Sequence, residues 1–96
     1  MILKLFTQPT CGKCPAAKAL VRQLKTQTCL PARQGCKIEE YDVTTVDGMA
    51  EASFYTVMAT PTILICDDSG RIIKGFRGET PSEKELISLI VKDKDL

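Results

Sequence analysis

Apolar positions along the chain follow two periods, and the change from one to the other predicts where strands and helices lie. Residues 2–6 form a short, nearly continuous apolar run, which is typical of a strand in the interior of a sheet. Residues 37–43 have mixed polarity, which suits a strand at the edge. Residues 62–66 are the strongest strand signal, and the turn residues at 67–70 predict a hairpin with a returning strand at 71–76.

Two segments between these strands have the helical period instead. The first predicted helix runs from Cys11 to about Thr26. Its apolar positions are Ala17, Leu20, Val21 and Leu24, and its polar positions are Lys18, Arg22 and Lys25. The second begins at a cap, Thr44 or Asp47, and runs to about Met58. Its predicted inner face consists of Ala50, Phe54, Val57 and Met58.

The last helix has the clearest predicted start. Thr80–Glu83 is a capping-box sequence with Pro81 at the first helical position. Its apolar face consists of Leu86, Ile87, Ile90 and Val91. The resulting order, β-α-β-α-β-β-α, predicts one α/β domain over residues 1–96, with a four-stranded mixed sheet and helices on both faces. The first βαβ unit should be parallel and right-handed, and the hairpin antiparallel.

Composition narrows the class of protein. The 96 residues are 44% hydrophobic and 26% charged with a net charge of +1, which is typical of a soluble globular domain and favours neither nucleic acid nor a membrane surface. Residues 1–6 contain Lys4 and lack the apolar stretch of a signal peptide, and no segment is long and apolar enough to span a bilayer. We therefore expect a cytoplasmic protein.

The candidate chemistry lies at Cys11 and Cys14, which form a C-x-x-C motif between a strand and a helix. Free cysteine has a pKa of about 8.5, so at pH 7 most of it is an unreactive thiol. The start of a helix stabilises a thiolate through its unpaired N–H groups and its dipole, and Lys13 adds a cation. We expect Cys11 to be the exposed nucleophile and Cys14 the protected resolving thiol. Pro15 is tolerated because the first helical turn has no N–H partner to lose.

Three segments resemble the thioredoxin/glutaredoxin superfamily and cover nearly the whole chain in the right order. Leu5–Cys14 (LFTQPTCGKC) resembles the strand, turn and active-site segment of glutaredoxins and of the small glutaredoxin-like thioredoxins. Ala59–Thr62 resembles the loop in which a cis-proline faces the disulfide, and Gly75–Gly78 resembles the final strand–glycine junction. The resemblance implies a thioredoxin-like fold and a cis Thr60–Pro61 bond beside the cysteine pair. It also implies that the Thr60 backbone pairs with an extended substrate.

Two differences from the family motifs bear on whether the chain is more similar to thioredoxins or to glutaredoxins. Thioredoxins usually have tryptophan before the first cysteine and proline inside the pair, whereas this chain has no tryptophan and carries Gly12 and Lys13. Glutaredoxins usually have a Gly-Gly-x-Asp type of segment for glutathione. Here Arg77–Thr80 has one glycine, and Glu79 should repel the glutathione carboxylate. We therefore predict dithiol activity like that of thioredoxins, with a glutathione-dependent glutaredoxin as the alternative.

The other three cysteines leave alternatives open. Cys29 and Cys36 flank a predicted loop, where they would form a second disulfide or remain free thiols. Together with Cys11 and Cys14 they are also the candidate ligands of a zinc site, although six residues separate Cys29 from Cys36 where zinc knuckles use two to four. Cys66 ends a buried strand and is interpreted as a small hydrophobe.

The predicted activity is therefore thiol–disulfide exchange, with no organic cofactor and no metal. The predicted partners are protein disulfides and an electron donor, either a thioredoxin-reductase-type enzyme or glutathione, and the predicted state is a monomer. A non-catalytic interaction module on the same fold is the remaining alternative.

Overall fold

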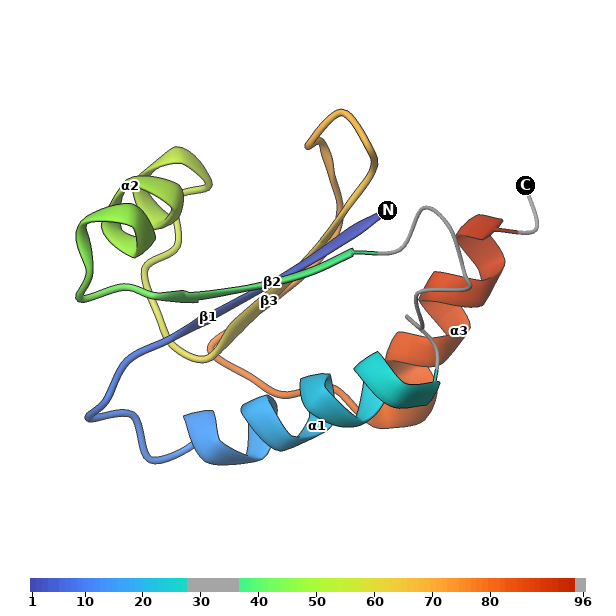
Figure 1. Cartoon of the computed structure of the whole chain (residues 1–96), viewed down its shortest axis with the longest axis horizontal. Helices are drawn as coiled ribbons and strands as arrows, with labels where there is room; N and C mark the ends of the chain where they lie inside the picture. The colour runs from blue at the N-terminus through green and yellow to red at the C-terminus, as the bar shows by residue number, and fades with distance from the viewer. Residues whose placement is uncertain (28–36, 95–96) are drawn as a thin grey trace.

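The computed structural model describes residues 1–27 and 37–94 and arranges seven elements around one sheet (Figure 1). In chain order they are β1 (Ile2–Thr7), α1 (Cys14–Gln27), β2 (Lys37–Asp42), α2 (Val46–Phe54), β3 (Thr62–Cys66), β4 (Ile72–Arg77) and α3 (Glu83–Lys94). This is the predicted β-α-β-α-β-β-α order. The strand bounds agree with the sequence prediction to within one residue.

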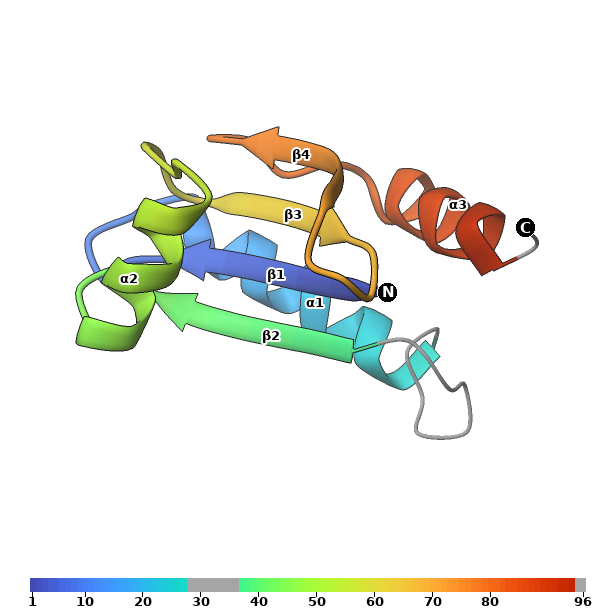
Figure 2. The same cartoon turned by 90° about the horizontal axis from the view of Figure 1, so that it is seen from above.

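The four strands form a mixed sheet in the order β2-β1-β3-β4 (Figure 2). β1 pairs in parallel with β2 and antiparallel with β3, and β3 and β4 form the antiparallel hairpin. The two apolar runs therefore become the central strands β1 and β3, whereas the mixed polarity of β2 places it at an edge. These features confirm the predicted mixed sheet.

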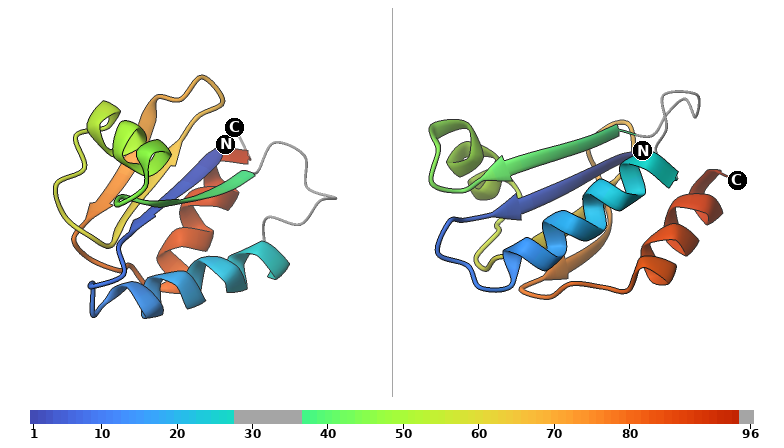
Figure 3. Two further views of the ribbon diagram at one scale, coloured as in Figure 1. Left: turned by 60° about the vertical axis from the view of Figure 1, so that its left-hand side comes forward. Right: turned by 60° about the horizontal axis from the view of Figure 1, so that its bottom comes forward.

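Helices cover both faces of this sheet, α2 on one face and α1 with α3 on the other (Figures 1 and 3). Because side chains alternate along a strand, each central strand contributes to two cores. The larger core, on the side of α1 and α3, contains Met1, Leu3, Leu5, Ala17, Val21, Leu24, Ile63, Ile65, Phe76 and Leu86. The smaller core, under α2, contains Phe6, Ala52, Leu64 and Cys66. Among the described helices, none has the length and apolar character that crossing a membrane requires.

The first helix begins at Cys14, three residues later than the sequence predicts. A turn precedes it, in which the Cys11 amide donates to the Gln8 carbonyl (3.1 Å) and the Cys14 amide to the Cys11 carbonyl (3.4 Å). The apolar face of the helix starts only at Ala17, so periodicity could not separate this turn from the helix. Pro15 lies in the first turn of α1, where it was expected to be tolerated.

The second helix differs from the prediction at both ends. Its N-cap is Thr45 rather than Thr44 or Asp47, because the Thr45 hydroxyl accepts a hydrogen bond from the Gly48 amide (3.0 Å). The helix ends at Phe54, four residues early, and the chain then turns through a residue of positive φ.

The inner face of α2 was also predicted wrongly. Of the four residues expected there only Val57, beyond the end of the helix, packs against the smaller core. Ala50, Phe54 and Met58 are exposed. The buried positions are Gly48 and Ala52, one turn apart. Small side chains allow the helix backbone to approach the sheet closely, so close packing rather than hydrophobicity selects this face.

The third helix starts at Glu83, and its cap is shifted by two residues. The Ser82 hydroxyl accepts from the Glu85 amide (3.1 Å), so an overlapping S-x-x-E sequence forms the cap, and Thr80 and Pro81 precede the helix. Leu86 is buried, and Ile87 packs against the larger core. The side chains of Ile90 and Val91 lie outside the described part.

We predict that Gly48→Ala destabilises the fold. A Cβ at position 48 would overlap the Asp42 carbonyl, a backbone group that cannot move without distorting the end of β2. Overpacking of this kind costs about 1–3 kcal/mol in the free energy of unfolding, measurable by urea denaturation. Gly12→Ala is the matched control, because a Cβ there meets nothing within 4 Å. Equal stability of the two variants would contradict the close contact.

Candidate active site

Cys11 and Cys14 are joined in a disulfide at the start of α1, with their Cα atoms 5.4 Å apart. The two cysteines differ in exposure: Cys11 is half-buried, whereas Cys14, the first residue of the helix, is 2% exposed. Gly12 and Lys13 between them are exposed. The pair therefore combines a partly exposed cysteine ahead of the helix with a buried cysteine at its first position.

The sheet register brings the other predicted site residues to the same end of the molecule. Phe6 lies opposite Thr62, and Thr62 lies opposite Arg77, so these three residues form one row across β1, β3 and β4. Beyond this row lie the turn that leads from β1 to Cys11 and the segment that enters β3 (Figure 2).

The Thr60–Pro61 peptide bond in this entering segment is cis, as the resemblance implied, and Pro61 is buried. The Pro61 carbonyl accepts from the Gly78 amide (2.8 Å), and the Thr62 hydroxyl donates to the Ala59 carbonyl (2.6 Å). Gly78 has a φ of 74°, a conformation that glycine adopts without steric cost. Backbone and side-chain bonds thus hold the cis-proline segment from both sides. Direct contact of Pro61 with the disulfide stays a prediction.

Arg77 holds the chain between α2 and the cis-proline. Its guanidinium donates to the Thr56 carbonyl (3.0 Å) and to the Tyr55 carbonyl (3.2 Å), both just past the end of α2. Carbonyls at a helix C-terminus lack intrahelical partners and carry partial negative charge, so a guanidinium fork suits them. Sequence analysis used Arg77 only as part of a motif and missed this contact.

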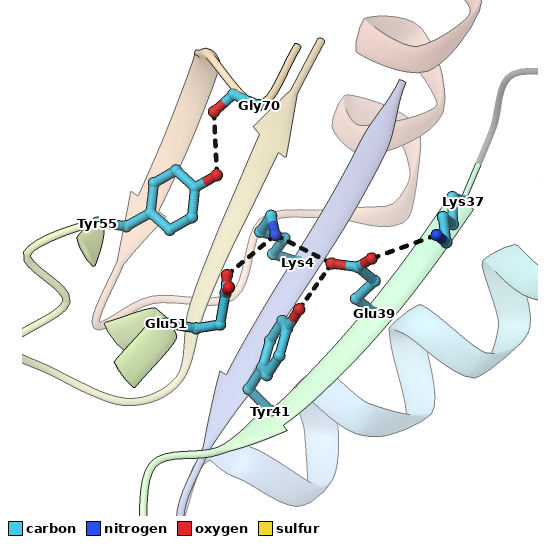
Figure 4. Close-up of polar contacts among 7 residues, drawn as sticks. All are labelled: Lys4, Lys37, Glu39, Tyr41, Glu51, Tyr55 and Gly70. Carbon is cyan, nitrogen blue, oxygen red and sulfur yellow. Dashed lines mark hydrogen bonds and ion pairs between the residues drawn. The ribbon is translucent and has the colours of Figure 1, made fainter. Parts of the chain in front are cut away.

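A buried lysine fixes α2 to the sheet (Figure 4). Lys4, on the central strand β1, is 6% exposed. Its ammonium group bonds to Glu39 of β2 (3.0 Å) and to Glu51 of α2 (3.1 Å). It also lies over the rings of Tyr41 and Tyr55, 5.4 and 5.2 Å from their centroids. Three elements are therefore tied through one cation.

Electrostatics keep this cluster charged. Burial opposes the charge of Lys4, but its bonds to Glu39 and Glu51 outweigh burial and hold the Lys4 pKa above its ordinary value. The bond from Lys4 in turn lowers the pKa of Glu39. Burial and a hydrogen bond donated to Glu39 (2.8 Å) raise the pKa of the Tyr41 hydroxyl. The signal that sequence analysis missed is a lysine between Leu3 and Leu5 in a central strand, since a buried cation needs carboxylate partners.

A pocket of about 110 Å³ lies next to the active-site turn. It is lined by Gln8, Val43, Val57, Met58, Ala59 and Thr60. The Gln8 carbonyl is the group that binds the Cys11 amide, and Thr60 immediately precedes the cis-proline. The pocket therefore borders both parts of the site, and no motif in the sequence indicated it.

Of the remaining three cysteines, the structure describes Cys66. Cys66 is a buried free thiol of the smaller core, and burial raises its pKa, consistent with its interpretation as a small hydrophobe. Cys29 and Cys36 lie outside the described residues, as does the second disulfide predicted for them. In the described ranges no three Cys, Asp or Glu residues gather as metal ligands, but the zinc alternative needs Cys29 and Cys36.

Comparison with known proteins agrees with this geometry. The family model of the thioredoxin domain matches residues 1–91. A probable thioredoxin of Archaeoglobus fulgidus is 32% identical over 92 residues, which are 96% of this chain and 88% of that protein. The chain belongs to the thioredoxin family. It is therefore a thiol–disulfide oxidoreductase, and the predicted superfamily is confirmed.

Further relatives of this thioredoxin-family chain extend the comparison. A thioredoxin of Methanocaldococcus jannaschii is 35% identical over 66 residues, 69% of this chain and 71% of that protein. The structure of thioredoxin 1 from Thermosipho africanus superposes with a TM-score of 0.76 at 22% identity, covering 99% of this chain and 96% of that one. At that identity the likeness shows the fold, and it confirms the predicted thioredoxin-like architecture.

We predict that the two lysines bonded to Glu39 differ sharply in their contribution to stability. Lys4→Met leaves Glu39 and Glu51 without their shared cation and should lower the free energy of unfolding by about 1–3 kcal/mol. This loss is smaller than for a fully buried ion pair because both carboxylates are partly exposed. Lys37→Met is the matched control, since Lys37 is exposed and lies 3.6 Å from Glu39. It should change stability by less than about 0.5 kcal/mol. Equal losses of unfolding free energy for the two variants, measured by urea denaturation, would contradict the stabilising role assigned to Lys4.

The same cluster predicts a pH dependence. Glu39 has a lower pKa in the folded state than the value of about 4.3 expected in the unfolded chain. The contribution of its ion pair to folding stability is therefore complete above about pH 4.3. It is lost as the pH falls through the folded-state pKa. The stability difference between the unmodified chain and Lys4→Met should therefore narrow on acidification from about pH 5 to pH 3. Denaturation curves across this range test it, and an unchanged difference would contradict the ion pair.

Proposed function

We propose that this thioredoxin-family protein reduces disulfides of other proteins through dithiol exchange at Cys11 and Cys14. The observation that carries the proposal is the joined pair, in which Cys11 is half-buried and Cys14 is buried. In the reduced protein the Cys11 thiolate attacks one sulfur of a substrate disulfide. A Cys11–substrate disulfide forms, and the other substrate sulfur leaves as a thiolate that takes up a proton.

Cys14 completes the exchange. Its thiolate attacks the Cys11 sulfur, the Cys11–Cys14 bond forms, and the second substrate thiolate is released and protonated. Two electrons pass from the dithiol to the substrate, so no organic cofactor is needed. The burial of Cys14 supports this role, because a sulfur that outside disulfides cannot reach remains available for the intramolecular step.

Thiolate formation at Cys11 is supported by its place ahead of α1. The positive end of the helix dipole stabilises a negative charge at the turn, and exposed Lys13 adds a cation at the surface. We propose that the Thr60 backbone, next to the cis-proline, pairs with the substrate as a short extended strand. A substrate held there would meet Cys11 from the end of the sheet at which both segments lie.

We propose a thioredoxin-reductase-type electron donor rather than glutathione. Gly78 is bonded to the Pro61 carbonyl, so exposed Glu79 follows directly at the edge of the cis-proline segment. Its carboxylate repels the carboxylates of glutathione, whereas a protein donor can place uncharged surface there. Such a dithiol works where thiols are kept reduced, which favours the cytoplasm.

We predict that the two cysteine variants separate the two steps. Cys14→Ser should accumulate a mixed disulfide with a disulfide substrate, visible as a mass adduct, and lose at least about 100-fold in turnover. Cys11→Ser should form no adduct and show no turnover. Cys66→Ala removes a buried thiol away from the pair and is the control, with turnover retained. Full activity of Cys11→Ser would contradict the mechanism.

The donor is tested separately in the same assay. Reduction of an insulin-type protein disulfide should be supported by a thioredoxin reductase and only weakly by glutathione with its reductase. Glu79→Gln should raise the glutathione-supported rate several-fold because it removes the opposing charge. Activity with glutathione alone would overturn the donor assignment and leave the dithiol mechanism in place.

A further inference from the structure

The outer face of α2 is apolar although it is exposed. Four exposed apolar residues form this face, called here the α2 stripe: Val46, Met49, Ala50 and Phe54. Val46 is 83% exposed and Phe54 is 77% exposed. In the part of the chain that the structure describes, α2 lies alone on its face of the sheet, so the stripe has no cover (Figures 1 and 3). Single apolar residues are common on protein surfaces, but a contiguous apolar patch marks an interaction site.

The Phe54 ring is held in place by its neighbour. It meets the Tyr55 ring edge-on, with the ring centroids 4.8 Å apart. The Tyr55 hydroxyl in turn donates to the Gly70 carbonyl (3.0 Å). An exposed side chain that is already restrained loses little conformational entropy when a partner covers it. Phe54 is therefore suited to anchor an interface, in which aromatic residues are enriched.

The spacing of the stripe makes it complementary to itself. Val46, Ala50 and Phe54 are four residues apart, so they lie along one ridge of the helix. Two ridges of this kind pack with their axes crossing at about 50°, the commonest class of helix packing. In an antiparallel pair with both Ala50 residues at the crossing point, Val46 of each copy lies beside Phe54 of the other. The small side chain of Ala50 lets the two helices approach closely there.

The charges of α2 favour the antiparallel arrangement. The helix carries two acidic residues, Asp47 and Glu51, and no basic residue. Glu51 is bonded to Lys4 (3.1 Å), so its charge is already paired. In an antiparallel pair Asp47 faces Ser53 of the other copy, and the two Asp47 residues lie about 9 Å apart along the helix direction. A parallel pair would instead place these two carboxylates opposite each other.

We propose that the α2 stripe binds the α2 stripe of a second copy, in an antiparallel helix pair with its two-fold axis at Ala50. This differs from the monomer expected from the sequence. A helix of nine residues offers less surface than the roughly 800 Å² per partner of a standard stable interface. The dimer is therefore reversible, with a dissociation constant between about 10 µM and 1 mM.

Sedimentation equilibrium of the full chain between about 10 µM and 2 mM tests the association. A reductant keeps intermolecular disulfides from contributing. The mean mass should rise with concentration from 10.6 kDa towards twice that value. A mass that stays at 10.6 kDa throughout would overturn the proposal and assign the stripe to a different partner. Growth beyond the dimer would overturn the closed two-fold pair.

Two matched variants show whether the stripe is the interface. Ala50→Glu places like charges at the crossing point and should lower the association constant at least about tenfold. Ala19→Glu makes the same change at an exposed alanine of α1, on the opposite face of the sheet, and should change the constant less than about twofold. Equal effects would mean that net charge governs association, and would overturn the assignment.

A mixture of two variants tests whether position 50 meets its own copy. Ala50→Glu and Ala50→Lys should each associate poorly alone. In an equimolar mixture the opposite charges meet, and the association constant should exceed that of either variant alone at least about fivefold. Such a gain also requires that both variants are folded. No gain would place position 50 against a different surface of the second copy and would contradict the two-fold pair.

Discussion

The antiparallel pairing of β1 with β3 is the constraint on which the site depends. It places Phe6 opposite Thr62, so the end of β1 and the start of β3 coincide. The chain that leaves β1 leads to Cys11, and the chain that enters β3 carries the cis Thr60–Pro61 bond. A one-residue change of register would turn every side chain of one strand to the opposite face, and both cores would be lost. The buried apolar runs of the two strands thus hold the two parts of the site together.

Around this pairing, charged groups hold α2 in place. The helix buries only Gly48 and Ala52 in its inner face, which gives it little apolar surface to bind the sheet. Lys4 compensates by joining β1 to β2 and to α2, and Arg77 and Tyr55 fasten the chain beyond the helix, the Tyr55 hydroxyl donating to the Gly70 carbonyl (3.0 Å). Because α2 leads directly into the cis-proline segment, its anchoring also determines where the rim of the pocket lies.

The sequence was sufficient for features that depend on local pattern. Hydrophobic period predicts the strands, the order of elements along the chain, the edge position of β2 and the face of α1. The C-x-x-C motif between a strand and a helix predicts the Cys11–Cys14 pair. Features that depend on tertiary contact were missed. The face of α2 is determined by close approach at Gly48, which hydrophobic period does not register. The cap of α3 is Ser82, although Thr80 begins an overlapping T-x-x-E sequence, and the local pattern does not separate the two. The bonds of Lys4 and Arg77, and the pocket next to the active-site turn, join residues far apart in the chain, so no local pattern contains them.

From family membership and geometry we propose a dithiol whose substrate lies between the Cys11 turn and the Thr60–Pro61 segment. The most direct measurement is NMR of the mixed disulfide between the Cys14→Ser variant and a cysteine peptide. We predict intermolecular nuclear Overhauser effects from the peptide backbone to Thr60 and Pro61, together with slower exchange of the peptide amide that pairs with Thr60. Contacts confined to α1, with none to Thr60 or Pro61, would contradict a single site formed by the two segments.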